Sequence, residues 1–143
     1  MATFNKINQF VEDLTKKVHN LSADTLKIYL SNATPDSAAD AVKADLAEIS
    51  AGNGYTAGGV TATITTCEQT AGTVKLILDG PWVITAAGGS VGPFRYAVLY
   101  NDTPTSPADP LIAWWDYGSA ITLASGETFT ITPDESAGVL TIA

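Results

Sequence analysis

Apolar positions near the start of the chain recur with the period of a helix. Hydrophobic residues return every three or four positions, and charged residues such as Glu12, Asp13, Lys16 and Lys17 fall between them. This spacing places the apolar side chains on one helical face. The members of that face are Phe4, Ile7, Phe10, Val11, Leu14, Val18 and Leu21. With Thr3 as a plausible N-cap, the pattern predicts one amphipathic helix over residues 3–20.

A change of period follows the polar turn residues at 20–24. From Thr25 the chain alternates, with Leu26, Ile28 and Leu30 on one side, which predicts a half-buried strand. Residues 34–36 break that strand. Ser37 followed by Asp40 resembles a capping box, so residues 37–49 are compatible with either a short helix or an irregular crossover.

The segment 51–59 contains four glycines and predicts a structured loop that leads into a further strand. Short runs rich in Thr, Val, Ile and aromatic residues then follow, separated by turn residues. They are 60–66, 73–79, 82–86, 94–101, 111–116, 120–123, 127–132 and 138–142. The segment 103–110, with three prolines, predicts an exposed loop.

Strands at this spacing, without helical patterns between them, indicate an antiparallel architecture. The predicted fold is therefore mainly β: an antiparallel β-sandwich or jelly-roll-like domain with one N-terminal amphipathic helix. A chain of 143 residues fits one domain. We expect the helix at 3–20 and the β-sandwich at 24–143.

Charge and composition limit the classes of partner. Charged residues make up only 15% of the chain, against roughly 25% in typical soluble domains. A polar but uncharged surface suits burial against another protein, because burying unpaired charge is costly. The net charge of −8 disfavours binding to nucleic acid or anionic lipid. No apolar run is long enough to span a membrane and no signal-peptide core is present, so we expect assembly in the cytoplasm.

Few residues offer chemistry. His19 is the single histidine, expected at the surface near the helix end, and Cys67 is the single cysteine, expected as a small buried hydrophobe. A single cysteine excludes an intrachain disulfide. One histidine and one cysteine are also too few ligands for a typical zinc site. The glycines at 52–59 match no phosphate-binding motif. We expect no catalytic residue, no metal and no cofactor.

Carboxylates are the remaining candidates for catalysis. Asp102, Asp109, Asp134 and Glu135 stand beside Asn, Pro, Ser or Gly, where turn formation is their ordinary role. A glycan hydrolase that uses a carboxylate pair is the enzymatic alternative. We predict that the chain is not an enzyme.

Aromatic side chains are the strongest candidates for contact with a partner. Trp114 and Trp115 are adjacent, so they point to opposite faces if they share a strand. Core packing, a subunit interface and a ligand surface all remain open for this pair. The candidate protein-interface residues are Trp114, Trp115, Tyr117, Phe94 and Tyr96, together with Phe10 and Leu14 of the helix.

Several segments resemble one class of viral protein. They are 25–32 (TLKIYLSN), 48–49 (EI), 52–59 (GNGYTAGG), 92–103 (GPFRYAVLYNDT), 111–118 (LIAWWDYG) and 126–131 (GETFTI). In this order, after a helix, they are similar to structural proteins of tailed bacteriophages. The similarity covers most of the chain and rests on strand and turn patterns.

The resemblance implies a location and partners. Small β proteins of this kind resemble capsid decoration or cement proteins, which implies a homotrimer on the capsid surface of the virion, bound to the major capsid protein. The N-terminal helix would then either dock on the capsid or cover one face of the sandwich. The alternative is a tail, baseplate or head-fibre module that recognises a host-surface glycan or joins virion parts.

Overall fold

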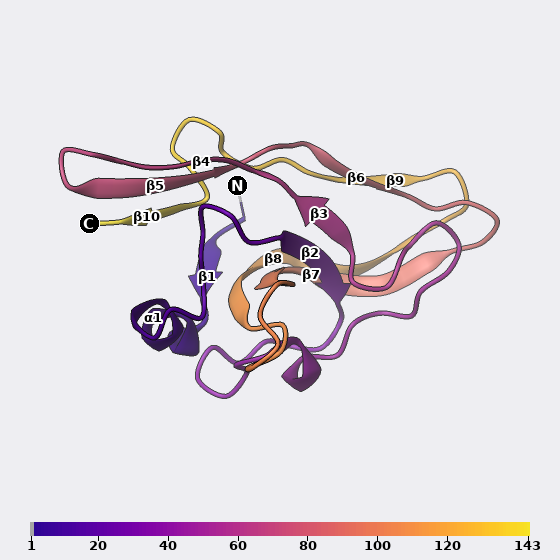
Figure 1. Cartoon of the computed structure of the whole chain (residues 1–143). Helices are drawn as coiled ribbons and strands as arrows, with labels where there is room; N and C mark the ends of the chain where they lie inside the picture. Colours follow the sequence, from indigo (N-terminus) through magenta and orange to yellow (C-terminus); the bar gives the residue numbers. More distant parts are fainter. Residues whose placement is uncertain (1) are drawn as a thin grey trace.

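Antiparallel strands dominate the computed structural model, which describes residues 2–143 (Figure 1). Within this range there are ten strands, one α-helix and one short 3-10 helix. Their bounds are β1 Phe4–Lys6, α1 Asn8–Thr15, β2 Leu26–Ser31, the 3-10 helix Lys43–Asp45, β3 Val60–Ala62, β4 Ile64–Thr70, β5 Thr73–Leu78, β6 Trp82–Thr85, β7 Val91–Asn101, β8 Leu111–Leu123, β9 Thr128–Ile131 and β10 Leu140–Ile142.

The largest sheet has five strands in the order β1-β8-β7-β2-β3. Its central strand β7 pairs with both β2 and β8, and these pairs are antiparallel. The two runs predicted at 111–116 and 120–123 form one continuous strand, β8. Register shifts in β7 and β8 bend this pair. Strand β2 lies where the alternation predicted it.

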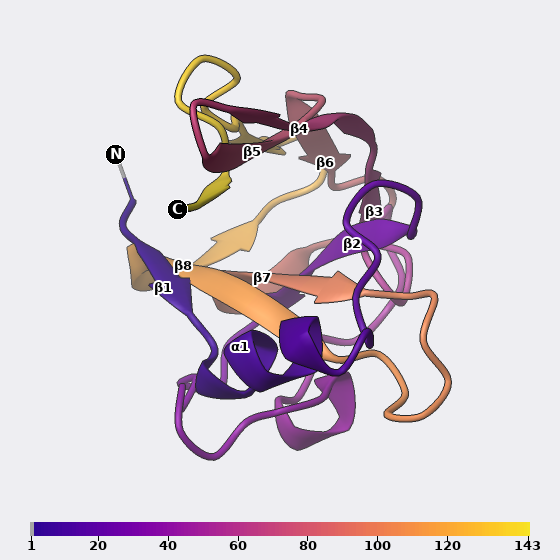
Figure 2. The same ribbon diagram turned by 60° about the vertical axis from the view of Figure 1, so that its left-hand side comes forward.

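Two smaller sheets lie over one face of the five-stranded sheet. They are β10-β5-β4 and β6-β9, and Figure 2 shows them on the opposite side of β7 and β8 from α1. Buried aliphatic and aromatic side chains from these sheets and from α1 form one cluster. The prediction of a mainly β, antiparallel fold with one N-terminal helix is confirmed.

The helix predicted at 3–20 is wrong in its bounds. Residues Phe4–Lys6 form strand β1 on the edge of β8, and α1 spans only Asn8–Thr15. The residue before α1 is Ile7, whose side chain makes no cap, so Thr3 is not the N-cap. Pairing with β8 satisfies backbone groups that a longer helix would have bonded internally. At the other end, Lys17 adopts a left-handed φ of 62°.

Most of the segment 37–49 is an irregular crossover with a single 3-10 turn. The irregular alternative was therefore the better of the two, although one helical turn is present. The run predicted at 60–66 divides into β3 and β4, and β7 begins three residues before the predicted strand. Cys67 is half-buried in β4, so it is less buried than the small buried hydrophobe that the sequence predicted.

His19 is buried, which corrects the expectation of a surface position. Because α1 ends at Thr15, the following residues turn back over the core, and His19 is only 7% exposed. Its ring centroid lies 5.0 Å from that of Phe10. His19 Nδ1 lies 3.1 Å from the side-chain amide nitrogen of Asn101, which donates to Asp24 Oδ2 at 2.6 Å.

Burial lowers the pKa of His19 below its ordinary value, and the negative charges of Asp13 and Asp24 oppose this shift. An amide donor faces Nδ1, so the neutral ring accepts there. The unfolded chain then binds more protons than the folded chain below about pH 6.5, the ordinary pKa of histidine. Stability is fully present above that pH and falls as the pH falls through the lowered pKa.

We predict that the loss of unfolding free energy between pH 7 and pH 5 is smaller in His19→Asn than in the wild type. Urea denaturation at half-unit pH steps measures it, and subtracting the two curves removes contributions from groups that both proteins share. Parallel curves would show that His19 makes no contribution to the pH dependence.

Candidate functional site

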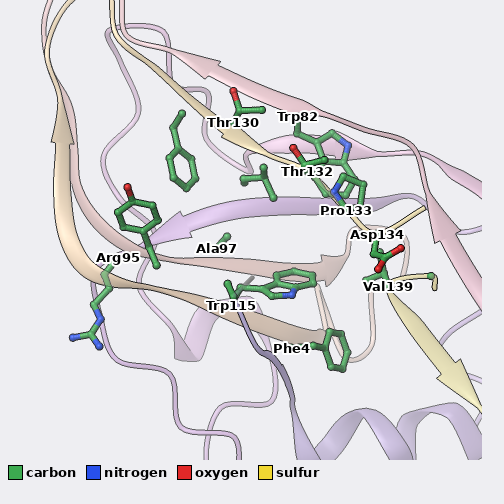
Figure 3. A pocket seen from close by; sticks show the side chains of 15 residues that line it. Phe4, Trp82, Arg95, Ala97, Trp115, Thr130, Thr132, Pro133, Asp134 and Val139 are labelled. Carbon is green, nitrogen blue, oxygen red and sulfur yellow. The ribbon is translucent and has the colours of Figure 1, made fainter. Parts of the chain in front are cut away.

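An apolar groove of about 470 Å³ lies between the five-stranded sheet and the C-terminal part of the chain. Figure 3 shows its side chains, with Phe4 and Trp115 on one side and Trp82, Thr132 and Pro133 on the other. The volume falls within the range of about 300–1,000 Å³ found for ligand sites. The lining residues are Ala2, Phe4, Trp82, Arg95, Ala97, Trp115, Tyr117, Phe129, Thr130, Ile131, Thr132, Pro133, Asp134, Gly138 and Val139.

The floor of the groove follows from strand register. Phe4 of β1 lies opposite Trp115 of β8, which lies opposite Ala97 of β7. Paired residues in neighbouring strands share a face of the sheet, so these three side chains form one row. The rings of Phe4 and Trp115 meet edge to face with centroids 5.7 Å apart.

Trp114 points to the other face of β8, as the alternation of a strand requires. Its indole nitrogen donates to Ser37 Oγ at 3.2 Å, and its ring packs on Tyr96 with centroids 5.7 Å apart. Trp114 is therefore half-buried by the crossover segment. Only Trp115 of the pair lines the groove.

The opposite wall comes from the two-stranded sheet. Trp82 of β6 lies opposite Ile131 of β9, and both line the groove. Phe129 packs edge to face on Tyr117 with ring centroids 5.6 Å apart. Tyr117 is 56% exposed, so a large aromatic surface at this end of the groove faces solvent.

Three charged residues lie at the groove: Arg95 and Asp134 line it, and Asp116 pairs with Arg95. Arg95 donates from Nε and Nη2 to the two carboxylate oxygens of Asp116, at 2.7 and 2.8 Å. These hydrogen bonds and one from the Gly118 amide lower the pKa of Asp116 to about 2, so it is ionised at neutral pH. Asp134 Oδ1 accepts from the amides of Ser136 and Ala137, which fixes the turn before β10.

Two of the seven predicted contact residues, Trp115 and Tyr117, line the groove. Phe94, Tyr96 and Phe10 are almost fully buried, and Phe10 is 1% exposed, so the core holds side chains that we had expected at an interface. Leu14 packs partly buried against the same core, which places the helix on its own domain. Trp114 packs on the crossover segment 37–49 and so does not line the groove.

The sequence did not identify Phe4, Trp82 or Phe129 as groove residues. Phe4 was assigned to the helix, because its spacing to Ile7 fits a helical period. Trp82 and Phe129 each lie in predicted strands, but the pairing of β6 with β9 joins segments about 45 residues apart. No local pattern identifies such a partner.

The groove is suited to holding apolar or aromatic groups. No histidine or cysteine lines it, and residues 2–143 contain no group of three His, Cys, Asp or Glu side chains able to hold a metal ion. Asp116, beside the groove, is bound by Arg95, and Asp134 uses one of its two carboxylate oxygens to fix its own turn. Over the same part of the chain, no helix combines the length and apolar character that crossing a bilayer requires.

Comparison with known proteins gives no relative. No family model, no curated protein and no solved structure matches this chain.

Proposed function

We propose that this chain is a structural protein of a tailed-bacteriophage virion, a capsid decoration protein that stabilises the head by binding the major capsid protein as a homotrimer. The observation that carries the proposal is the apolar groove lined by five aromatic side chains, Phe4, Trp82, Trp115, Tyr117 and Phe129. Aromatic residues dominate the energetics of protein interfaces, particularly where a pocket excludes water.

The rest of the molecule supports attachment rather than catalysis. The groove is framed by paired strands, and rigid elements position contact residues more accurately than loops do. Low charge over the whole chain reduces the desolvation cost of covering its surface. A decoration protein repeats the same contact over a lattice, so modest contacts at each site are sufficient.

The proposal is tested by co-sedimentation with capsids assembled from the major capsid protein of the same phage. We expect the wild type to bind saturably, and Trp115→Ser to bind at least about tenfold more weakly, because interface tryptophans commonly contribute 2 kcal/mol or more. Trp114→Ser is the matched control, since it removes the same side chain from the other face. Circular dichroism confirms that both variants fold.

Saturable binding that Trp114→Ser retains and Trp115→Ser loses would support attachment through the groove. Equal losses in both variants would argue against the groove as the contact surface. A wild type that fails to bind capsids at any concentration would contradict the decoration role.

A second function is favoured by one observation, the exposure of Tyr117 beside Phe129. The exposed ring of Tyr117 next to a bidentate Arg–Asp pair offers a stacking surface and polar partners for a sugar. The chain would then act in a tail, baseplate or head fibre that recognises a host-surface glycan. Binding on a glycan array that Tyr117→Ala abolishes, without capsid binding, would favour this function over decoration.

A further inference from the structure

Strand β1 leaves backbone groups free on its outer edge. Ile7 donates its amide to the Ile112 carbonyl at 3.0 Å. In an antiparallel ladder the bonded residues alternate, so Asn5 also faces β8 and the amides and carbonyls of Phe4 and Lys6 point away from it. β1 is the last strand of its sheet, and within residues 2–143 no further strand covers this edge.

The open edge adjoins the groove. Phe4 belongs to β1 and also lines the groove, so the edge strand itself forms part of the floor. On the side where Phe4 lies, Asp134 and Val139 stand across from it (Figure 3). A strand added to β1 would continue the row Ala97, Trp115 and Phe4 with its own inward side chain.

Edge and groove together match a known mode of peptide recognition. An extended segment that adds to a sheet gains backbone hydrogen bonds, while pockets select its alternate side chains. β1 offers an amide and a carbonyl at each of Phe4 and Lys6, and the aromatic lining accepts a large apolar side chain. The aromatic groove alone would not distinguish an extended segment from a helix, but the free backbone groups of the edge require a strand.

Charge indicates the composition of that segment. The chain carries a net charge of −8. At the groove, Asp134 uses Oδ1 for its own turn, and no hydrogen bond from residues 2–143 reaches Oδ2. A lysine or arginine of the incoming segment can pair with this carboxylate, and a basic segment is favoured by the field of the whole protein.

We propose that the open edge of β1 binds an extended segment of the capsid protein, which pairs with Phe4 and Lys6, inserts an apolar side chain beside Phe4 and Trp115, and directs a basic residue to Asp134. The inference rests on the proposed attachment to the capsid, and it adds which kind of capsid segment binds and through which groups. A second copy of the acidic chain is the less favoured occupant, because it brings like charge to the site.

Residue-resolved hydrogen exchange of the wild type, free and bound to capsids, tests strand addition directly. The outward amides of Phe4 and Lys6 should exchange fast in the free protein and at least roughly tenfold more slowly in the complex, because a new ladder bond protects them. Capsid binding without protection at these amides would overturn the inference and leave the decoration role intact. Absence of capsid binding would contradict both.

Hydrogen exchange in the free protein shows whether a second copy of the chain binds the edge of β1 instead. Protection of Phe4 and Lys6 that rises with protein concentration, without capsids, would assign the edge to a second copy and overturn the inference. The same amides should remain unprotected in the free protein over the whole concentration range. This result needs no variant and does not depend on how substitutions affect folding.

Two substitutions test the partner chemistry. Lys6→Pro removes an outward amide while leaving the bonds of Asn5 and Ile7 to β8, and should weaken capsid binding roughly tenfold. Asp134→Asn keeps the oxygen that fixes the turn, removes the charge, and should weaken binding roughly threefold at low salt. Glu135→Gln, a neighbouring exposed carboxylate, is the control. Equal effects of the two acidic substitutions would contradict a specific role for Asp134.

Discussion

Replacing Gly59 with alanine is expected to lower the unfolding free energy by about 2–5 kcal/mol. A Cβ at this position would lie 1.9 Å from the carbonyl oxygen of Ile28 and 2.7 Å from the Cα of Tyr29. Both atoms belong to the backbone of β2, which pairs with β3 and β7 and cannot move aside without breaking those pairs. Overpacking of about 1–3 kcal/mol adds to a left-handed backbone cost of about 1–2 kcal/mol.

Gly72→Ala is the matched control for this prediction. Gly72 has a φ of +87°, close to the +74° of Gly59, but its Cβ would meet no atom within 4 Å. The control therefore measures the cost of the left-handed conformation alone, about 1–2 kcal/mol. Urea denaturation of both variants gives the difference, which is the cost of the close approach to β2. Similar losses in the two variants would show that the approach is not tight.

Replacing Glu48 with alanine is expected to cost about 3 kcal/mol of unfolding free energy. Its side chain is 14% exposed, and its carboxylate accepts from the Tyr55 hydroxyl at 2.7 Å and the Gly58 amide at 2.6 Å and pairs with Lys43 at 2.6 Å. Removing it leaves these donors unpaired, including the ammonium group, which lies 5.3 Å from the ring centre of Tyr29.

The same substitution at Glu12 gives the comparison. Glu12 pairs with Lys16 one helical turn away, but its side chain is 53% exposed, and solvent screens such a pair so that it contributes little to stability. We expect Glu12→Ala to change the urea midpoint very little. A Glu48→Ala midpoint as close to the wild type as that of Glu12→Ala would refute a structural role for the Glu48 network.

Local sequence patterns predicted most of the strands, because apolar and polar residues alternate where one face of a strand packs on the core. They failed at the N-terminus, where the positions of Phe4 and Ile7 satisfy a helical period. The free edge of β8 decides between the two structures there, and a distant edge is invisible in a local window. His19 was misplaced for the same reason, since its burial follows from the early end of α1.

The candidate site was predictable only in part. The adjacent residues Trp114 and Trp115 must point to opposite faces of a strand, so the sequence predicts that only one of them can face the crossover segment. Which one lines the groove depends on the register with β1 and β7. The opposite wall depends on β9 returning to β6, a long-range pairing without a local signal.

The most direct test of attachment through the groove is a cryo-electron microscopy reconstruction of capsids saturated with this protein. We predict density for the chain on the capsid surface, with the groove turned toward the major capsid protein and an extended capsid segment beside β1. Density that places Trp115 and the outer edge of β1 toward solvent, or capsids that carry no additional density, would contradict the account.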